Sequence, residues 1–157
     1  MGLKFPPEDL AMMRIALAAG IALIFATSVY GEDAEVYVDY RQGLMSAVGG
    51  NTSASAAILI DGAPFEANLE EHARAIERLT EDIPALFPEG TDHEDSDAKP
   101  EVWDDRSTFE ERAEASHRAA TAFREAVEEG DPAQAMPYFR ELGGSCSNCH
   151  DDFRVEE

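Results

Sequence analysis

Beyond about residue 31 the chain reads as helices separated by short breaks. Apolar side chains recur at intervals of three and four residues, and runs of β-branched residues are few, which predicts an all-α fold. Four helices are expected, over roughly residues 34–60, 65–86, 102–129 and 131–154. Each carries one apolar stripe, as a helix packed on one side requires. The expected core positions are Tyr37, Leu44, Met45, Val48; Leu69, Ala73, Ile76, Leu79, Ile83, Leu86; Phe109, Ala113, Ser116, Ala120, Phe123, Val127; and Met136, Phe139, Leu142.

Glycine and proline predict where these helices are interrupted. The run Gly49–Asn51 predicts a kink or break within the first helix. Pro84 should disturb the last turn of the second helix. Gly130 should end the third helix, and Asp131 with Pro132 should cap and start the fourth. Pro137 lacks a backbone donor, so an irregular first turn is expected there.

The segment 87–100 is rich in Pro, Gly and acidic residues and predicts a loop crossing between helices. Four amphipathic helices predict a four-helix bundle, whose core can hold a cofactor. Residues 32–157 are therefore expected to form a single domain.

The first thirty-one residues have a different composition. Arg14 precedes an apolar run, Ile15–Val29, and an acidic segment begins at Glu32. This order predicts a secretory signal peptide over residues 1–31, with an uncleaved signal anchor as the alternative. The apolar run is short for a membrane span. Export from the cytoplasm, to the periplasm in a bacterium, is expected.

The sequence is strongly acidic, with 33 Asp and Glu against 12 Lys and Arg and a net charge of −21. Such a charge repels phosphates and argues against a nucleic-acid partner. Two interpretations remain. The acidic residues either form a solvated, salt-tolerant surface, which their spread along the chain favours, or steer the protein toward a basic redox partner.

The C-terminal segment contains the candidate chemistry. Cys146-Ser147-Asn148-Cys149-His150 has the spacing C-x-x-C-H of a c-type haem attachment site. The thiols of Cys146 and Cys149 would bond to the two haem vinyl groups, and His150 would be the proximal iron ligand. One covalent haem c, with its iron, is therefore expected inside the bundle, which should be poorly folded before attachment.

Zinc binding or dithiol redox chemistry is the alternative use of this cysteine pair. A zinc site needs a second pair of ligands, but His72, His93 and His117 are scattered singly. These histidines are expected to be ordinary helix or loop residues, with His72 as the reserve iron ligand. A thioredoxin-like motif needs a neighbouring βαβ pattern, and none is apparent.

Several segments resemble the class II cytochromes c, the cytochromes c′ and c556. Residues 40–45 resemble the family's first-helix signature, residues 87–91 and 99–103 its central loop, and residues 143–154 its C-terminal haem site. The resemblance covers the chain from about residue 33 to its end. It implies an antiparallel four-helix bundle, often a homodimer through its first two helices. It also implies a periplasmic haem protein that transfers electrons, binds NO and CO, or does both.

The same resemblance assigns further site residues. Met45 matches the position of the sixth iron ligand in the c556 branch, and ligation there would give a low-spin electron carrier. Arg41, one turn earlier, would pair with a haem propionate or form a surface salt bridge. Arg154 would lie on the proximal side of the haem. Alternatively, it is an ordinary cation that interacts favourably with the dipole at the C-terminal end of its helix. Trp103 is expected to anchor the start of the third helix or pack in the core.

The function expected from these observations is electron transfer with Met/His-ligated, low-spin iron, and no enzymatic activity. The alternative is a five-coordinate cytochrome c′ that binds NO or CO, with Met45 packed over the iron.

Overall fold

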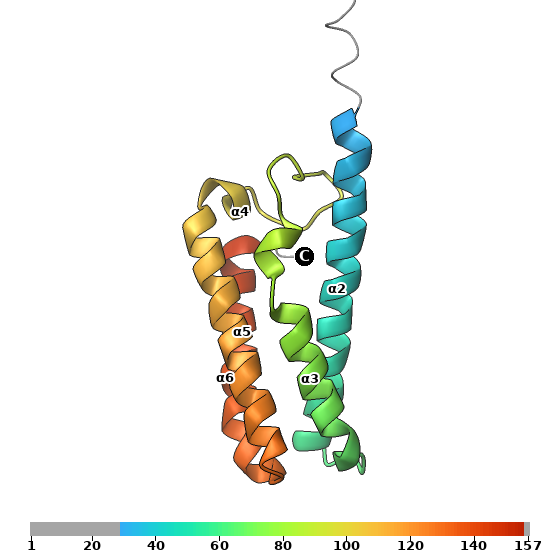
Figure 1. Ribbon diagram of the computed structural model, residues 1–157, viewed down its shortest axis with the longest axis vertical. Coiled ribbons are helices and arrows are strands. Elements are labelled where there is room, and N and C mark those ends of the chain that lie inside the picture. The colour runs from blue at the N-terminus through green and yellow to red at the C-terminus, as the bar shows by residue number, and fades with distance from the viewer. Residues whose placement is uncertain (1–28, 156–157) are drawn as a thin grey trace, which may run out of the picture. The chain divides into compact units, whose positions relative to one another are not determined.

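The computed structural model describes residues 29–155, so the expected signal segment lies almost wholly outside the described part. The described elements are the helices α2 (Val29–Leu59), α3 (Leu69–Thr80), α4 (Glu101–Asp104), α5 (Arg106–Glu128) and α6 (Pro132–Phe153), and the 3-10 turns η1 (Glu66–Asn68) and η2 (Ile83–Leu86). Within the unit Ala34–Glu157, helices α2, α3, α5 and α6 run alternately up and down (Figure 1). The expected antiparallel four-helix bundle is confirmed.

Helix α2 is continuous, so the break expected at Gly49–Asn51 is wrong. Polar side chains just beyond the glycines bond back to the preceding turn. Asn51 Nδ2 donates to the Ala47 carbonyl at 2.8 Å, and Thr52 Oγ1 donates to the Val48 carbonyl at 2.9 Å. Burial of Val48 and Ile58 on either side then favours one uninterrupted helix over a break.

The second expected helix is shorter than its periodicity suggested. Regular helix ends at Thr80, and Pro84 lies in the separate turn η2. Pro84 cannot donate a backbone hydrogen bond, and the residue before proline avoids helical geometry. The apolar stripe nevertheless continues, because Ile83 is buried beyond the break.

The third expected helix is divided at Asp105, which the sequence analysis missed. The short α4 ends at Asp104, and Asp105 has a non-helical backbone with φ −119° and ψ 57°. The Asp105 carboxylate then accepts a hydrogen bond from the Thr108 amide at 3.4 Å. An N-cap inside the expected helix therefore starts α5 four residues late.

The start of α6 agrees with the sequence. Gly130 has φ +88°, which favours glycine, and the Asp131 carboxylate accepts from the Ala133 amide at 2.9 Å. Pro132 is the first helical residue. The helix continues through Pro137, so the expected irregular turn is wrong. Burial of Phe139 and Leu142 directly after Pro137 holds the helix together.

The hydrophobic core forms two clusters. The larger, here the lower core, joins all four long helices; the smaller, here the upper cluster, lies near α4 and the end of α6. Tyr37 is 41% exposed and is not the core residue expected, whereas Arg41 and Ser55 on the same helix are buried. The lower core comprises Val48, Ile58, Leu69, Ala73, Ile76, Ala119, Ala120, Phe123, Ala126, Ala135, Phe139 and Leu142. The upper cluster comprises Ile83, Phe87, Val102, Phe109, Ala113 and Phe153.

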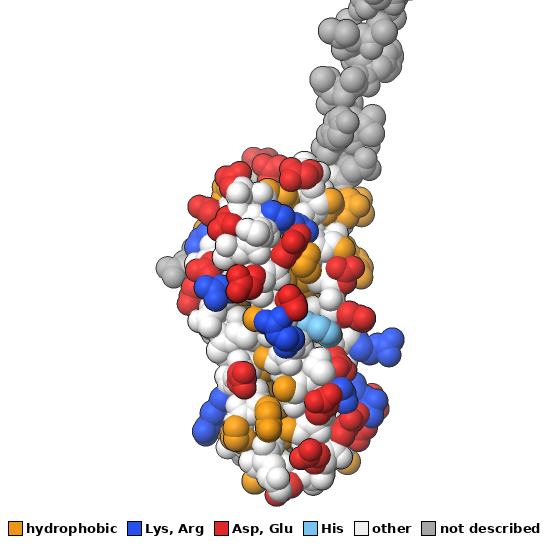
Figure 2. Space-filling view, turned by 60° about the vertical axis from the view of Figure 1, so that its left-hand side comes forward, with side chains coloured by type: hydrophobic (Ala, Val, Ile, Leu, Met, Phe, Trp, Pro, Cys, Tyr) orange, Lys and Arg blue, Asp and Glu red, His pale blue; other side chains and the backbone are white. Residues whose placement is uncertain are grey.

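Acidic side chains are spread over the face shown in Figure 2, with basic ones between them. Arg124 joins two helices by ion pairs: it contacts Glu77 on α3 at 2.8 Å and Glu128 on its own helix at 2.6 Å. Among residues 29–155 no helix is long and apolar enough to cross a membrane.

Candidate functional site

The C-x-x-C-H residues occupy the last two turns of α6. Both cysteines are half-buried and neither forms a disulfide. Cys146 packs against the lower core, and Cys149 packs against the upper cluster. His150 is exposed on the same helix. The motif therefore presents two thiols to the interior and places an imidazole at the surface of the bundle.

Burial controls the protonation of the thiols. It raises the pKa of Cys149 to about 11, with smaller contributions from Cys146 and Asp152, and it also raises the pKa of Cys146. Both sulfurs are therefore protonated thiols at neutral pH in the absence of a bound group. In the described part of the chain, no three His, Cys, Asp or Glu side chains are grouped to hold a metal ion by themselves.

The surroundings of the His150 ring favour its neutral, metal-binding form. Desolvation lowers its pKa, repulsion by Arg154 lowers it further, and Asp151 acts in the opposite direction. A neutral imidazole has a free lone pair for a metal. Arg154 is exposed beside the motif, and its backbone amide donates to the His150 carbonyl at 2.9 Å.

The core divides into its two clusters at the level of the motif. On α6 the division falls between Cys146 and Cys149. On α2 it falls between Leu44, which packs against the lower core, and Met45, which packs against the upper cluster. Two thiols, an imidazole and a surrounding apolar lining suit a flat, largely apolar macrocycle bound through sulfur and iron. The residues present therefore fit a covalent haem.

Met45 is partly buried against the upper cluster, which includes three stacked aromatic rings. Phe87 and Phe109 of the upper cluster pack edge to face, with ring centroids 5.1 Å apart, and Phe109 packs the same way on Phe153 at 5.3 Å. Met45 and Trp103 are partly buried and pack against the cluster that contains these rings. A thioether packs favourably against aromatic rings, so Met45 is held by apolar contacts.

Arg41 is the most deeply buried charged residue in the described part of the chain, at 3% exposure. Its guanidinium donates to the Leu86 carbonyl (3.3 Å), to Oγ1 and the carbonyl of Thr91 (both 3.0 Å) and to Ser96 Oγ (3.2 Å). It also lies 4.7 Å from the centre of the Phe87 ring. Arg41 forms no surface salt bridge; it binds the segment after η2.

The loop 87–100 is also fastened to the end of α6. Lys99 donates its backbone amide to the Phe153 carbonyl at 2.9 Å and its Nζ to the Asp151 carbonyl at 2.7 Å. Ala98 and Arg154 form an isolated antiparallel bridge. Trp103 Nε1 donates to the Pro88 carbonyl at 2.9 Å and so ties α4 to the loop. The loop is thereby connected to both α2 and the haem motif.

The three isolated histidines contact other residues. His72 Nδ1 is 2.9 Å from Asn51 Oδ1, His117 Nδ1 is 3.4 Å from Thr80 Oγ1, and His93 is 3.5 Å from Asp95. His93 is only 27% exposed and does not project freely into solvent. None of the three packs with the cysteine motif in the two core clusters.

The comparison with known proteins decides the family. A family model described as Cytochrome C′ matches residues 36–154. The chain belongs to the cytochrome c′ family. A cytochrome c′ from Pararhodospirillum photometricum is 39% identical over 76% of this chain and 97% of its own length. A cytochrome c-556 from Rhodopseudomonas palustris is 26% identical over 93% of this chain and 99% of its own.

A solved structure with the same fold is a nitric oxide complex of a cytochrome c prime variant from Alcaligenes xylosoxidans, in which a leucine is replaced by alanine. It is 26% identical, covers 79% of this chain and 97% of its own, and has a TM-score of 0.73. The expected class II cytochrome c family is thereby confirmed, and the protein is a haem cytochrome of this family with one covalent haem c and its iron.

Proposed function

We propose that this cytochrome c′ binds small diatomic gases, nitric oxide above all, at five-coordinate iron, with Met45 packed over the open side. The observation that carries the proposal is the packing of Met45 against the aromatic upper cluster, where it acts as an apolar cover. The sequence favoured an electron carrier with Met/His-ligated iron, and the five-coordinate, gas-binding alternative is proposed in its place.

The names of the relatives support the same choice. The cytochrome c′ relative is 39% identical and the cytochrome c-556 relative 26% identical. The Alcaligenes xylosoxidans variant with this fold is a complex with nitric oxide. Both observations favour a gas-binding cytochrome c′ over a c556-type carrier.

We assign the attachment of haem to Cys146 and Cys149 and the proximal ligand to His150. The haem, when bound, supplies an iron that can hold a diatomic ligand or exchange an electron. The protein supplies two inward-facing thiols and an imidazole kept neutral by desolvation and by Arg154. We accordingly assign to Arg154 the electrostatic control of His150 on the proximal side.

Arg41 is assigned to a haem propionate. It is buried, burial lowers its pKa, and none of its four hydrogen-bond acceptors is a carboxylate. A buried guanidinium is most stable beside an anion, and a propionate supplies one. Its present bonds brace the segment 86–96 around the same site.

Export to the periplasm through the signal over residues 1–31 is part of this proposal, because covalent haem c is attached outside the cytoplasm. The expected gas ligands are NO and CO. A basic periplasmic redox partner remains a prediction from the net charge of −21.

A homodimer through α2 and α3 is proposed as well. A groove of about 550 Å³ on these helices is lined by Val36, Asp39, Tyr40, Gly43, Leu44 and Leu79. Val36 is 67% exposed and Tyr40 62% exposed, and such apolar exposure is typical of an interface. Sedimentation of the Tyr40→Glu variant tests this: a dimeric wild type and a monomeric variant are expected, and a monomeric wild type contradicts it.

Spectra of the ferric and ferrous protein test the proposed function. The wild type should be high-spin in the ferric state and bind CO in the ferrous state. Met45→Leu, which keeps the apolar cover, should leave the ferric spectrum unchanged, while Met45→Ala should speed CO binding. A low-spin wild type that becomes high-spin in Met45→Leu would show that Met45 is a ligand and that the protein is an electron carrier.

A further inference from the structure

The backbone that carries Phe87 is irregular, and its carbonyls are bound by side chains from three helices. Arg41 of α2 binds the Leu86 and Thr91 carbonyls, and Trp103 of α4 binds that of Pro88. Arg106 of α5 binds the carbonyls of Pro84 and Phe87. The Pro84 and Pro88 carbonyls also accept local bonds from the amides of Phe87 and Thr91, so the long-range donors add to the turns of this segment.

Arg106 donates from all three nitrogens of its guanidinium. Its Nη1 is 2.8 Å from the Phe87 carbonyl oxygen and its Nη2 is 2.7 Å from that of Pro84. The third edge of the guanidinium, Nε, is 2.7 Å from Glu110 Oε1. The planar fork of arginine can span two carbonyls at once, whereas a lysine ammonium is a single point donor.

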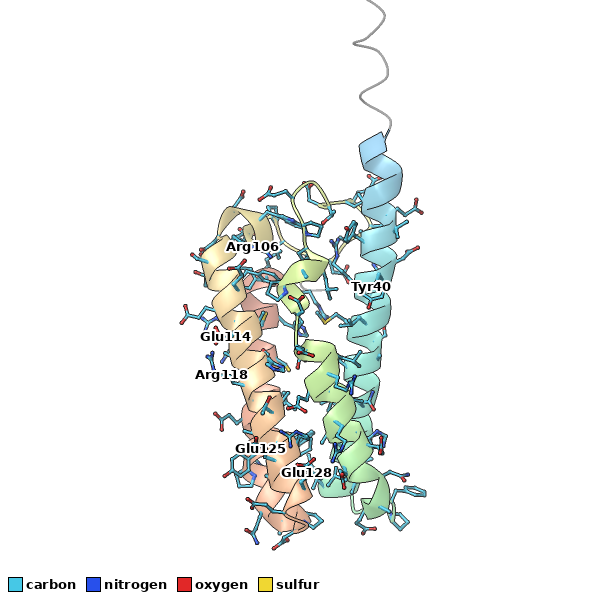
Figure 3. All side chains as sticks on the ribbon, in the orientation of Figure 1. Tyr40, Arg106, Glu114, Arg118, Glu125 and Glu128 are labelled. Carbon is cyan, nitrogen blue, oxygen red and sulfur yellow. The ribbon has the colours of Figure 1, made fainter. Side chains whose placement is uncertain are left out.

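The position of Arg106 within α5 gives no local reason for an arginine there. It is the first residue of the helix, where the helix dipole disfavours a cation. Arg118, farther along α5, shows the ordinary alternative: it pairs with Glu114 at 2.6 Å, and both side chains are more than half exposed (Figure 3). Arg106 is only 33% exposed and reaches across to another segment.

The Phe87 ring connects Arg106 to the upper cluster, against which Met45 packs. Phe87 is 9% exposed and packs edge to face on Phe109 and on Trp103. The Arg106 guanidinium itself lies 5.4 Å from the centre of the Phe109 ring. Met45 packs against the cluster to which Phe87 and Phe109 belong. A shift of the Phe87 backbone would therefore loosen the packing around Met45.

We propose that Arg106 is a positioning residue for gas binding: by bonding the Pro84 and Phe87 carbonyls together, it fixes the aromatic wall against which Met45 packs and so limits how readily a diatomic ligand displaces Met45. This inference rests on the proposed function. The Glu110 ion pair is secondary, because the carbonyl bonds to Pro84 and Phe87 come from the other two nitrogens of Arg106.

The test is the rate of CO binding to the ferrous haem protein, with the ferric spectrum and urea unfolding measured on the same samples. Arg106→Gln should bind CO at least about threefold faster than wild type, because the loss of charged hydrogen bonds frees Phe87. Arg106→Lys keeps one bond and should give an intermediate rate. Glu110→Gln, which keeps both carbonyl bonds, and the matched surface variant Arg118→Gln should bind at the wild-type rate.

Several results would overturn the proposal. One is a CO-binding rate in Arg106→Gln equal to that of the wild type. If Arg106→Gln does not fold, a wild-type CO-binding rate in Arg106→Lys would overturn the proposal in the same way. Another is a rate in Glu110→Gln equal to that in Arg106→Gln, which would assign the effect to the ion pair. Failure of the proposed function is distinguishable, because it appears in the wild type itself as low-spin ferric iron without CO uptake, and it overturns both ideas.

Discussion

Replacing the buried Arg41 should destabilise the protein more than replacing its exposed neighbour. Arg41→Met keeps an unbranched chain against Phe87 but removes all four hydrogen bonds. Two of the acceptors keep other partners, since Thr91 Oγ1 donates to the Pro88 carbonyl at 2.8 Å and Ser96 Oγ accepts from the Ala98 amide at 3.2 Å. The carbonyls of Leu86 and Thr91 lose their side-chain donor.

Each carbonyl left without its donor costs about 1–3 kcal/mol. Burial of the Arg41 guanidinium lowers its pKa, which indicates that the charge is desolvated. Removing this desolvated charge offsets part of the cost. The free energy of unfolding should therefore fall by about 2–4 kcal/mol. The matched control is Gln42→Ala, which removes one exposed bond to the Asp95 carbonyl (2.9 Å) in the same loop and should cost about 1 kcal/mol or less.

The assay is urea unfolding of the haem-loaded proteins, followed by far-ultraviolet circular dichroism. Limited proteolysis of the loop 87–100 gives a second readout, and the loop should be cut faster in Arg41→Met. The reasoning is refuted if Arg41→Met and Gln42→Ala lose the same stability within about 0.5 kcal/mol, the scatter of surface substitutions.

Three further predictions concern the rest of the bundle. Phe123→Ala empties a fully buried site in the lower core and should lower the free energy of unfolding by about 3–5 kcal/mol in urea titration, and a loss below about 1 kcal/mol would contradict the packing. Asp131→Ala removes the N-cap of α6. Hydrogen bonds from Gln134 and the Ala133 amide hold the pKa of Asp131 below its ordinary 3.8. The ionised cap therefore stabilises the folded protein above that pH, and this stabilisation is lost as the pH falls through the pKa of Asp131 in the folded state. Wild type and Asp131→Ala should thus differ in thermal unfolding at neutral pH and converge in acid, and a constant difference would be inconsistent. Arg124→Gln breaks the contacts with Glu77 and Glu128 and should lower the melting temperature more at low than at high salt, whereas equal shifts would exclude a charge effect.

The cysteine motif and the helical stripes could be predicted because both depend on spacing along the chain. Cys146, Cys149 and His150 lie within one and a half helical turns, and Met45 follows Arg41 by one turn. The buried stripe of Leu69, Ala73 and Ile76 is equally local. Such patterns are fixed by the helical repeat itself.

The remaining features depend on contacts between distant residues. Arg41 binds acceptors 45 to 55 positions away, and Arg106 binds carbonyls 19 and 22 positions away. No periodicity predicts such pairs. The uninterrupted helix at Gly49 shows the same limit, because burial of Val48 and Ile58 overrides the weak helix propensity of glycine.

The central claim is that one haem is bound covalently by Cys146 and Cys149. Its most direct test is the intact mass of the protein matured in a periplasm able to attach haem, measured after extraction with acid and acetone. The account predicts the mass of the chain plus one haem, and loss of that addition when both cysteines are replaced by serine. A wild-type chain with both thiols unmodified after that maturation would contradict the account.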